Sequence, residues 1–166
     1  MSQRHVIFSH GQGSGPWGSK ITAMAEVARG LGFTVESVDY QAIDDPAQRV
    51  ERLLEVGKAL GTPAVLVGSS LGGHVATAAS GQLGAKGLFL MAPAFYMPGY
   101  EQYTPRPADC PVCIVHGWRD DVVPVENSIR WAREHRAALH ILDGDHRLQE
   151  NIPQINALFA DFLDRL

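Results

Sequence analysis

Six short apolar runs alternate along the chain with longer segments in which apolar residues recur every three or four positions. Each run has the length of a strand, roughly four to eight residues, and several are rich in β-branched residues. Continuous apolar runs of this kind are typical of strands whose two faces are both covered. We therefore predict strands at His5–Ser9, Phe33–Val38, Ala64–Gly68, Gly87–Met91, Val112–His116 and Ala138–Leu142.

The segments between these runs have the spacing of amphipathic helices. In the first of them Ile21, Met24 and Ala28 fall on one stripe, as expected of a helix that packs on a core. Pro46 suits the first turn of the second helix, whereas Pro153 should kink or restart the last. The predicted helices are Ser19–Leu31, Pro46–Leu60, Leu71–Ala79, Val125–Glu134 and Arg147–Leu166.

The alternation of strand and helix predicts an α/β fold, with about six parallel strands and helices on both faces of the sheet. The 166 residues form a single predicted domain, with the second strand beside the first at one edge. Residues 92–111 interrupt the pattern with five prolines, three tyrosines and no clear period. This stretch is too long for an ordinary connection, so we expect a functional loop or a short irregular excursion.

Composition and charge argue against nucleic acids and membranes as binding partners. Fourteen Lys and Arg against 18 Asp and Glu give a net charge of -4 without a basic cluster, which indicates no nucleic-acid-binding surface. The longest mostly apolar run, Gly87–Met97, is too short to span a bilayer, and the first residues lack the pattern of a secretory signal. We expect a soluble, cytoplasmic protein. Cys110 and Cys113 border an apolar strand and are predicted to be reduced thiols.

The sharpest chemical signal is a G-x-S-x-G pattern, Gly68 to Gly72, directly after the third predicted strand. Between a strand and a helix, this pattern forms a strained turn that exposes the hydroxyl of its central serine, here Ser70. The glycines on either side let the neighbouring backbone pass closely. The turn also opens a helix, so the Leu71 N–H faces the site and can hold an oxyanion. Ser70 is thus a candidate nucleophile.

A serine nucleophile requires a base and an acid that orients the base. The carboxyl ends of parallel strands meet at one edge of the sheet, and the last two predicted strands end near these residue types. Asp120 and Asp121 follow the fifth strand, and His146 follows the sixth. The order Ser, Asp, His is the one expected for this fold.

The segments HGQGSG, GSSLGG, HGWRDDVVP and GDH resemble four signatures of the α/β-hydrolase superfamily, in the right order. The resemblance implies that Asp120 is the acid, His146 the base and the Gln12 N–H the second oxyanion donor. The chain is most similar to small lidless esterases and dienelactone-hydrolase-like proteins, although its nucleophile is serine and not cysteine. We expect the N-terminal antiparallel strands and the helical lid common in the superfamily to be absent from it.

The remaining histidines and the second aspartate have plainer interpretations. His10 and His116 precede glycines at strand ends, where they are expected to build the local turn. His74 lies one helical turn after Ser70 and is expected to point along the helix, away from the nucleophile. Asp121 fits a helix-capping role.

Two alternative functions stay open. Residues 13–18 fit G-x-G-x-x-G, and Asp39 lies 21 residues beyond Gly18, as in a dinucleotide-binding site. However, Pro16 lies inside the turn, where the backbone N–H groups should contact the pyrophosphate. A non-catalytic binding protein with the same fold is the other alternative. The sequence favours a serine hydrolase that cleaves a small ester-type substrate, carboxylester or thioester, through an acyl-enzyme on Ser70, with no metal or cofactor.

The sequence leaves the substrate, the acyl chain length and the oligomeric state undefined. Without a lid the pocket should be shallow and open. The aromatic residues Trp17 and Trp118 and the stretch Phe95–Met97 are candidates for its lining, and core packing is an equal alternative for each.

Overall fold

The computed structural model describes residues 3–166. Six strands form one parallel sheet in the order β2-β1-β3-β4-β5-β6, which confirms the predicted α/β architecture with the second strand at an edge. The strands are β1 (Arg4–Ser9), β2 (Phe33–Val38), β3 (Val65–Ser69), β4 (Gly87–Met91), β5 (Val112–Gly117) and β6 (Ala138–Leu142). The predicted bounds are correct to within one residue.

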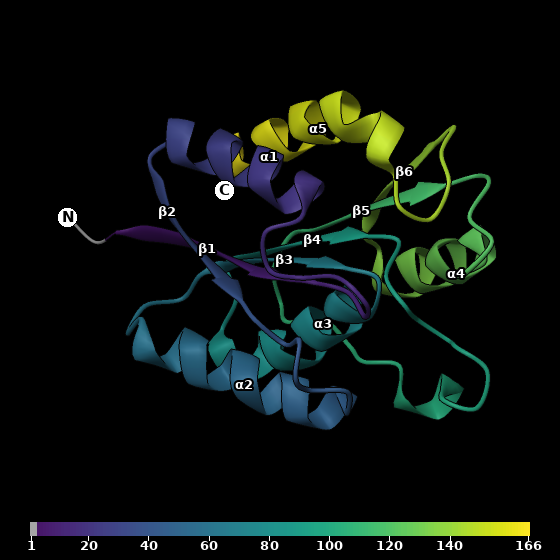
Figure 1. Ribbon diagram of the computed structural model, residues 1–166, viewed down its shortest axis with the longest axis horizontal. Helices are drawn as coiled ribbons and strands as arrows, with labels where there is room; N and C mark the ends of the chain where they lie inside the picture. Colours follow the sequence, from purple (N-terminus) through teal and green to yellow (C-terminus); the bar gives the residue numbers. More distant parts are fainter. Residues whose placement is uncertain (1–2) are drawn as a thin grey trace.

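Five α-helices cover the two faces of the sheet (Figure 1). Helices α1 and α5 lie together on one face, and α2, α3 and α4 lie on the other. Two short 3-10 turns, η1 (Glu101–Tyr103) and η2 (Gln149–Asn151), interrupt the loops. The helices are α1 (Ser19–Gly30), α2 (Pro46–Ala59), α3 (Leu71–Leu83), α4 (Val125–His135) and α5 (Ile152–Asp164).

Successive residues of each central strand point to opposite faces of the sheet. In β1, Val6 and Phe8 pack under α1 and α5, whereas Ile7 packs against the helices of the other face. In β4, Phe89 and Leu90 divide between the two cores in the same way. Both faces of these strands are buried, which explains why their sequences are continuous apolar runs and do not alternate between apolar and polar residues.

The last helix is shorter than predicted, because it begins at Ile152 and not at Arg147. Pro153 occupies its first turn, where the missing N–H costs nothing, so the proline restarts the helix as expected. The preceding residues form a turn instead: the Asp145 carboxylate accepts from the Arg147 and Leu148 N–H groups. This turn fixes the loop that follows β6 at the carboxyl edge of the sheet.

Helix α3 continues to Leu83, four residues beyond its predicted end at Ala79. It stops at Gly84, which adopts a left-handed conformation with φ of 57°, a common helix terminator. The strand register aligns the carboxyl ends of β1, β3 and β4, with Ser9 beside Gly68 and Ser69 beside Met91. These strand ends carry the loops that form the candidate site.

Candidate active site

Ser70 lies at a sharp turn between β3 and α3, in a strained backbone conformation with φ of 53° and ψ of -120°. The flanking glycines are sterically required. A Cβ on Gly68 would lie 2.4 Å from the Gly72 carbonyl oxygen, and one on Gly72 would lie 2.0 Å from the Ser9 carbonyl oxygen. Because side chains do not fit there, the sequence can close this turn only with glycine at both positions.

Backbone hydrogen bonds hold the turn in this strained shape. The Ser70 N–H donates to the Met91 carbonyl at 3.0 Å, which ties the turn to β4. The Ser70 carbonyl accepts from Gly73 at 3.0 Å and from Ala94 at 2.9 Å. The hydroxyl of Ser70 therefore has a fixed position above the sheet edge.

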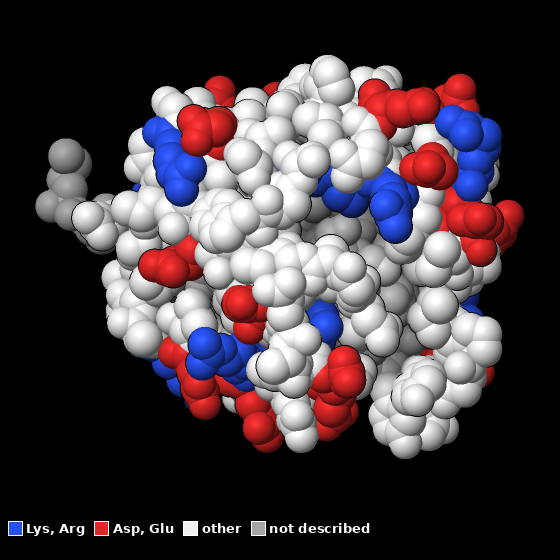
Figure 2. All heavy atoms as spheres, in the orientation of Figure 1, with Lys and Arg blue, Asp and Glu red and all other residues white. Residues whose placement is uncertain are grey.

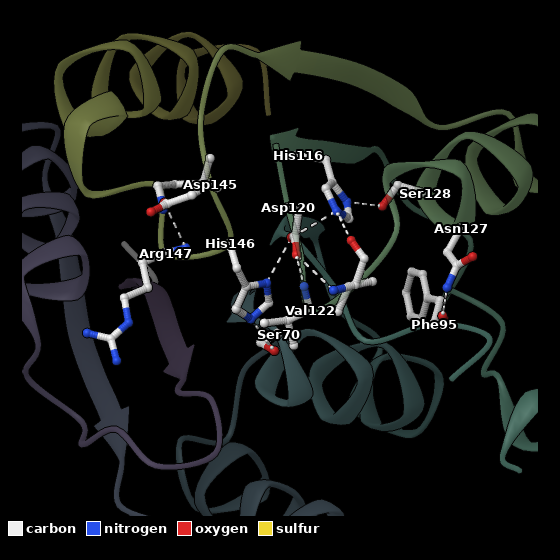
Figure 3. Close-up of polar contacts among 12 residues, drawn as sticks. Ser70, Phe95, His116, Asp120, Val122, Asn127, Ser128, Asp145, His146 and Arg147 are labelled. Carbon is white, nitrogen blue, oxygen red and sulfur yellow. Dashed lines mark hydrogen bonds and ion pairs between the residues drawn. The ribbon is translucent and has the colours of Figure 1, made fainter. Parts of the chain in front are cut away.

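His146 joins Ser70 to Asp120 across three strand ends (Figure 3). Its Nε2 lies 3.0 Å from Ser70 Oγ, and its Nδ1 lies 2.8 Å from Asp120 Oδ2. A carboxylate only accepts, so Nδ1 carries the proton and Nε2 is free to accept from the Ser70 hydroxyl. The structure thus brings together the three side chains that the sequence analysis selected.

The two neighbouring aspartates differ sharply in environment. The side chain of Asp120 is 0 % exposed, and its Oδ1 accepts from the Val122 and Val123 N–H groups at 2.9 and 2.8 Å. Asp121 is exposed to solvent. Of the two, Asp120 is the one that contacts His146 within residues 3–166. Four N–H contacts, from Val122, Val123, His146 and His116, fix the orientation of this carboxylate.

One of these contacts comes from His116, which the sequence analysis took for a turn residue. Its Nε2 lies 3.1 Å from Asp120 Oδ2 and 2.9 Å from the Val123 carbonyl. Both partners accept, so Nε2 carries the proton, and Nδ1 accepts from the Ser128 hydroxyl at 2.7 Å. Burial lowers the pKa of His116. The neutral ring therefore donates a second histidine N–H to Asp120. This role depends on Ser128 of α4, which contacts the other ring nitrogen.

Leu71 and Gln12 carry the backbone N–H groups that are predicted to hold an oxyanion at Ser70. Both residues line its pocket, and neither N–H donates to another group within residues 3–166. Leu71 is the first residue of α3, where a helix N–H has no partner inside the helix. The loop after β1 passes close to the nucleophile: a Cβ on Gly11 would lie 3.4 Å from Ser70 Cβ.

Ser70 opens into a pocket of about 1200 Å³. Apolar lining comes from Met97, Tyr100 and Tyr103 on the loop of residues 92–111, so this loop belongs to the site. Trp17 and Trp118 are about half exposed at 48 % and 60 % and do not line it. Phe95 and Tyr96 also pack elsewhere; Phe95 stacks on Trp131 in the core.

Two other histidines approach the site without joining it. His10 is buried and receives the Tyr40 N–H on Nε2, while its Nδ1 donates to the Gly11 carbonyl at 2.8 Å, so it builds the local turn as expected. His74 lines the pocket, which corrects the expectation that it points away from the site. Its backbone N–H donates to the Ser70 carbonyl at 3.3 Å, whereas the ring nitrogen bonded to the Ser70 hydroxyl is that of His146.

Cys110 and Cys113 are free thiols, and burial raises the pKa of Cys113 to about 12. No cluster of three His, Cys, Asp or Glu side chains within residues 3–166 is arranged to hold a metal ion. No helix in the same range is long and apolar enough to cross a membrane.

The model of the alpha/beta hydrolase family matches residues 6–164. The chain belongs to this family. The match spans all the strands and helices described above except the first two residues of β1. It favours a hydrolase over the dinucleotide-binding alternative, and the glycine-rich residues 11–15 line the pocket of Ser70.

Several relatives have similar sequences or structures. A protein of Xanthomonas campestris pv. campestris assigned to the α/β hydrolase superfamily is 38 % identical, with a TM-score of 0.93 over 100 % of both chains. The mitochondrial palmitoyl-protein thioesterase ABHD10 of mouse is 25 % identical over 97 % of this chain and 75 % of its own length. Est1E from Butyrivibrio proteoclasticus shares the fold, with 18 % identity, a TM-score of 0.88 and coverage of 99 % of this chain and 88 % of Est1E. Family and relatives together identify a hydrolytic enzyme.

Proposed function

We propose that this hydrolase cleaves a carboxylic ester or thioester through an acyl-enzyme on Ser70, with His146 as general base and Asp120 as the orienting acid. One observation carries the proposal: the His146 ring lies 3.0 Å from Ser70 Oγ and 2.8 Å from Asp120 Oδ2. Both distances are in the range of hydrogen bonds that move protons. A fully connected set of three such groups is difficult to explain in a protein that only binds.

In the first half of the reaction, Ser70 Oγ attacks the carbonyl carbon while its proton passes to His146 Nε2. Asp120 holds the other ring nitrogen and stabilises the imidazolium that forms. The Leu71 and Gln12 N–H groups hold the developing oxyanion, a contribution of about 3 kcal/mol per donor. Collapse of the intermediate breaks the ester or thioester bond, and the leaving group takes the proton from His146.

In the second half, water hydrolyses the acyl-enzyme. His146 removes a proton from the water as its oxygen attacks the acyl carbon, and the oxyanion is held as before. The Ser70–acyl bond then breaks, Ser70 regains its proton from His146, and the carboxylic acid leaves. All groups return to their starting protonation states, so the cycle needs no cofactor.

The named relatives support ester and thioester substrates. The mouse relative is a palmitoyl-protein thioesterase, and Est1E was solved with ferulic acid bound. The pocket of this chain has apolar walls at Met97, Tyr100 and Tyr103, which suit the uncharged part of such a substrate. We further propose a cytoplasmic location for the protein.

The experiment that tests the proposed function is the pH profile of p-nitrophenyl acetate hydrolysis. Because a general base must be unprotonated to accept the Ser70 proton, we expect kcat/KM to fall as the pH is lowered from 8 to 5. A profile that stays flat over this range, after subtraction of the uncatalysed rate, would exclude His146 as the base. Absence of any hydrolysis at pH 8, with this ester and with a thioester, would contradict the proposed activity itself.

A further inference from the structure

Lys20 places a cationic amine in the pocket beside the nucleophile. It is the second residue of α1 and lines the pocket together with Ser70. Its Nζ donates to Ser69 Oγ at 3.2 Å, and Ser69 is the residue directly before the nucleophile. The sequence analysis did not select Lys20, because nothing in its local pattern distinguishes it from a surface lysine.

No carboxylate neutralises this amine within residues 3–166, where the ion pairs do not include Lys20. Two carboxylates, those of Asp120 and Asp145, are close enough to act on its charge but form no ion pair with it. Asp120 is engaged by His146, His116 and two backbone N–H groups, and Asp145 accepts from the backbone of its own turn. Lys20 is partly buried, and lysines are rarely buried without a partner because removing a charge from water is costly. The one hydrogen bond that the amine donates, to the neutral Ser69 hydroxyl, does not offset that cost.

Arg147 adds a second cation to the same wall of the pocket. It directly follows His146 and lines the pocket, and Figure 3 shows it on the side of His146 away from His116. The acidic lining residues, Asp44 and Asp45, lie instead at the start of α2. In Figure 2, basic side chains border the hollow on the visible face. The pocket is therefore polarised, with positive charge near α1 and the loop of His146.

We propose that Lys20, assisted by Arg147, binds a carboxylate group of the substrate, so that the enzyme selects esters or thioesters that carry a negative charge. The inference rests on the proposed function, because it assigns the charge of the substrate cleaved at Ser70. A carboxylate would give the amine the partner it lacks. Charge-assisted hydrogen bonds of this kind are about twice as strong as neutral ones.

The carboxylate could belong to the acyl or to the alcohol part of the substrate, and two substrate pairs distinguish these cases. The first pair is mono-p-nitrophenyl glutarate and p-nitrophenyl pentanoate, which differ in charge on the acyl side. The second pair is 4-acetoxybenzoate and its methyl ester, which differ on the alcohol side. The measured quantity is the ratio of kcat/KM for the charged member over the neutral member, at pH 7.

The wild-type protein is expected to prefer the charged member of one pair by about tenfold or more, the size of one charge-assisted hydrogen bond. Lys20→Met should remove this preference, and Lys20→Arg should retain most of it because the charge remains. Lys86→Met is the matched control. Lys86 is exposed directly before β4, at the amino-terminal end of the strand and opposite to the site. Its replacement should leave the ratio unchanged.

A purely structural role for Lys20, as a tie between α1 and β3, makes a different prediction. Ser69→Ala removes the same hydrogen bond and leaves the amine in place. If Lys20 acts on the substrate, Ser69→Ala keeps the preference for the charged ester. If Ser69→Ala abolishes the preference as Lys20→Met does, the preference depends on the Lys20–Ser69 hydrogen bond and the inference is wrong.

The preference should also depend on pH in one direction. Burial lowers the pKa of Lys20 to about 8, opposed by the charges of Asp145 and Asp120 and reinforced by that of Arg147. Lys20 is then mostly charged at pH 7 and mostly neutral at pH 9.5, while the substrate carboxylate stays ionised. The ratio should fall over this range. Any effect of pH on the catalytic groups cancels in the ratio, because both substrates use the same groups.

The outcomes separate this inference from the proposed function. Hydrolysis of both members of each pair with ratios near one in the wild type, unchanged in Lys20→Met, would overturn the carboxylate site and leave the serine hydrolase intact. A failure to hydrolyse any of the four esters would instead contradict the proposed function, and with it the inference.

Discussion

Replacing Ser70 by alanine is expected to reduce kcat/KM for p-nitrophenyl acetate to the background level, a loss of about 10⁴-fold or more. The Ser70 hydroxyl oxygen is the atom that forms the acyl-enzyme. The neighbouring Ser69 hydroxyl cannot replace it, because it accepts a hydrogen bond from Lys20 and does not contact His146. Alanine fits the turn because its backbone has the same allowed conformations as that of serine. The measurement is the initial rate of p-nitrophenolate release by purified protein.

A thermal melt of the Ser70→Ala protein provides the control. Its Tm should lie within a few degrees of the wild-type value, because the variant loses one hydrogen bond to His146 and no backbone contact, a change of about 1 kcal/mol. Hydrolysis that persists in a folded Ser70→Ala protein would contradict the assignment of the nucleophile.

The second large effect is expected from Asp120→Asn, with a loss of about 10⁴-fold in kcat. The asparagine carbonyl can still accept from Val122 and Val123, which leaves its NH2 group facing His146 and His116. Both ring nitrogens in contact are donors in the present arrangement, so His146 must turn or change tautomer. It then presents an N–H to Ser70 and cannot act as a base.

Asp121→Asn is a matched control, because Asp121 is the adjacent residue, has the same side chain and is exposed. Its activity should stay within about twofold of wild type, since surface substitutions of this kind rarely change local structure. If Asp121→Asn lost as much activity as Asp120→Asn, the orienting acid would be wrongly assigned.

Much of the fold follows from local sequence. The central strands β1, β3, β4 and β5 are apolar runs because both of their faces are covered. The edge strands β2 and β6 are only partly buried and include polar residues. The elbow at Ser70 was also predictable, since its glycines are required by backbone atoms that approach within 2.0 to 2.4 Å of the missing side chains. The grouping of Ser70, Asp120 and His146 followed from the rule that parallel strand ends meet at one edge.

Features that depend on side chains from distant elements were not predictable in this way. The contact of His116 with Asp120 needs Ser128 of α4 to set the ring tautomer. The charge of Lys20 matters only because β3 and the loops after β5 and β6 close around it. The error at the start of α5 has a related cause: Leu148, with φ of 55°, is buried by tertiary packing, and helical spacing does not reveal such a turn.

The most direct test of the central claim is covalent labelling with a fluorophosphonate probe, followed by mass spectrometry of the intact protein and of its peptides. The account predicts a single adduct on Ser70, with a labelling rate at least about 100-fold lower in a His146→Ala variant, because the base that activates the hydroxyl is gone. An unlabelled wild-type protein, an adduct on another serine, or equal labelling of His146→Ala would contradict it.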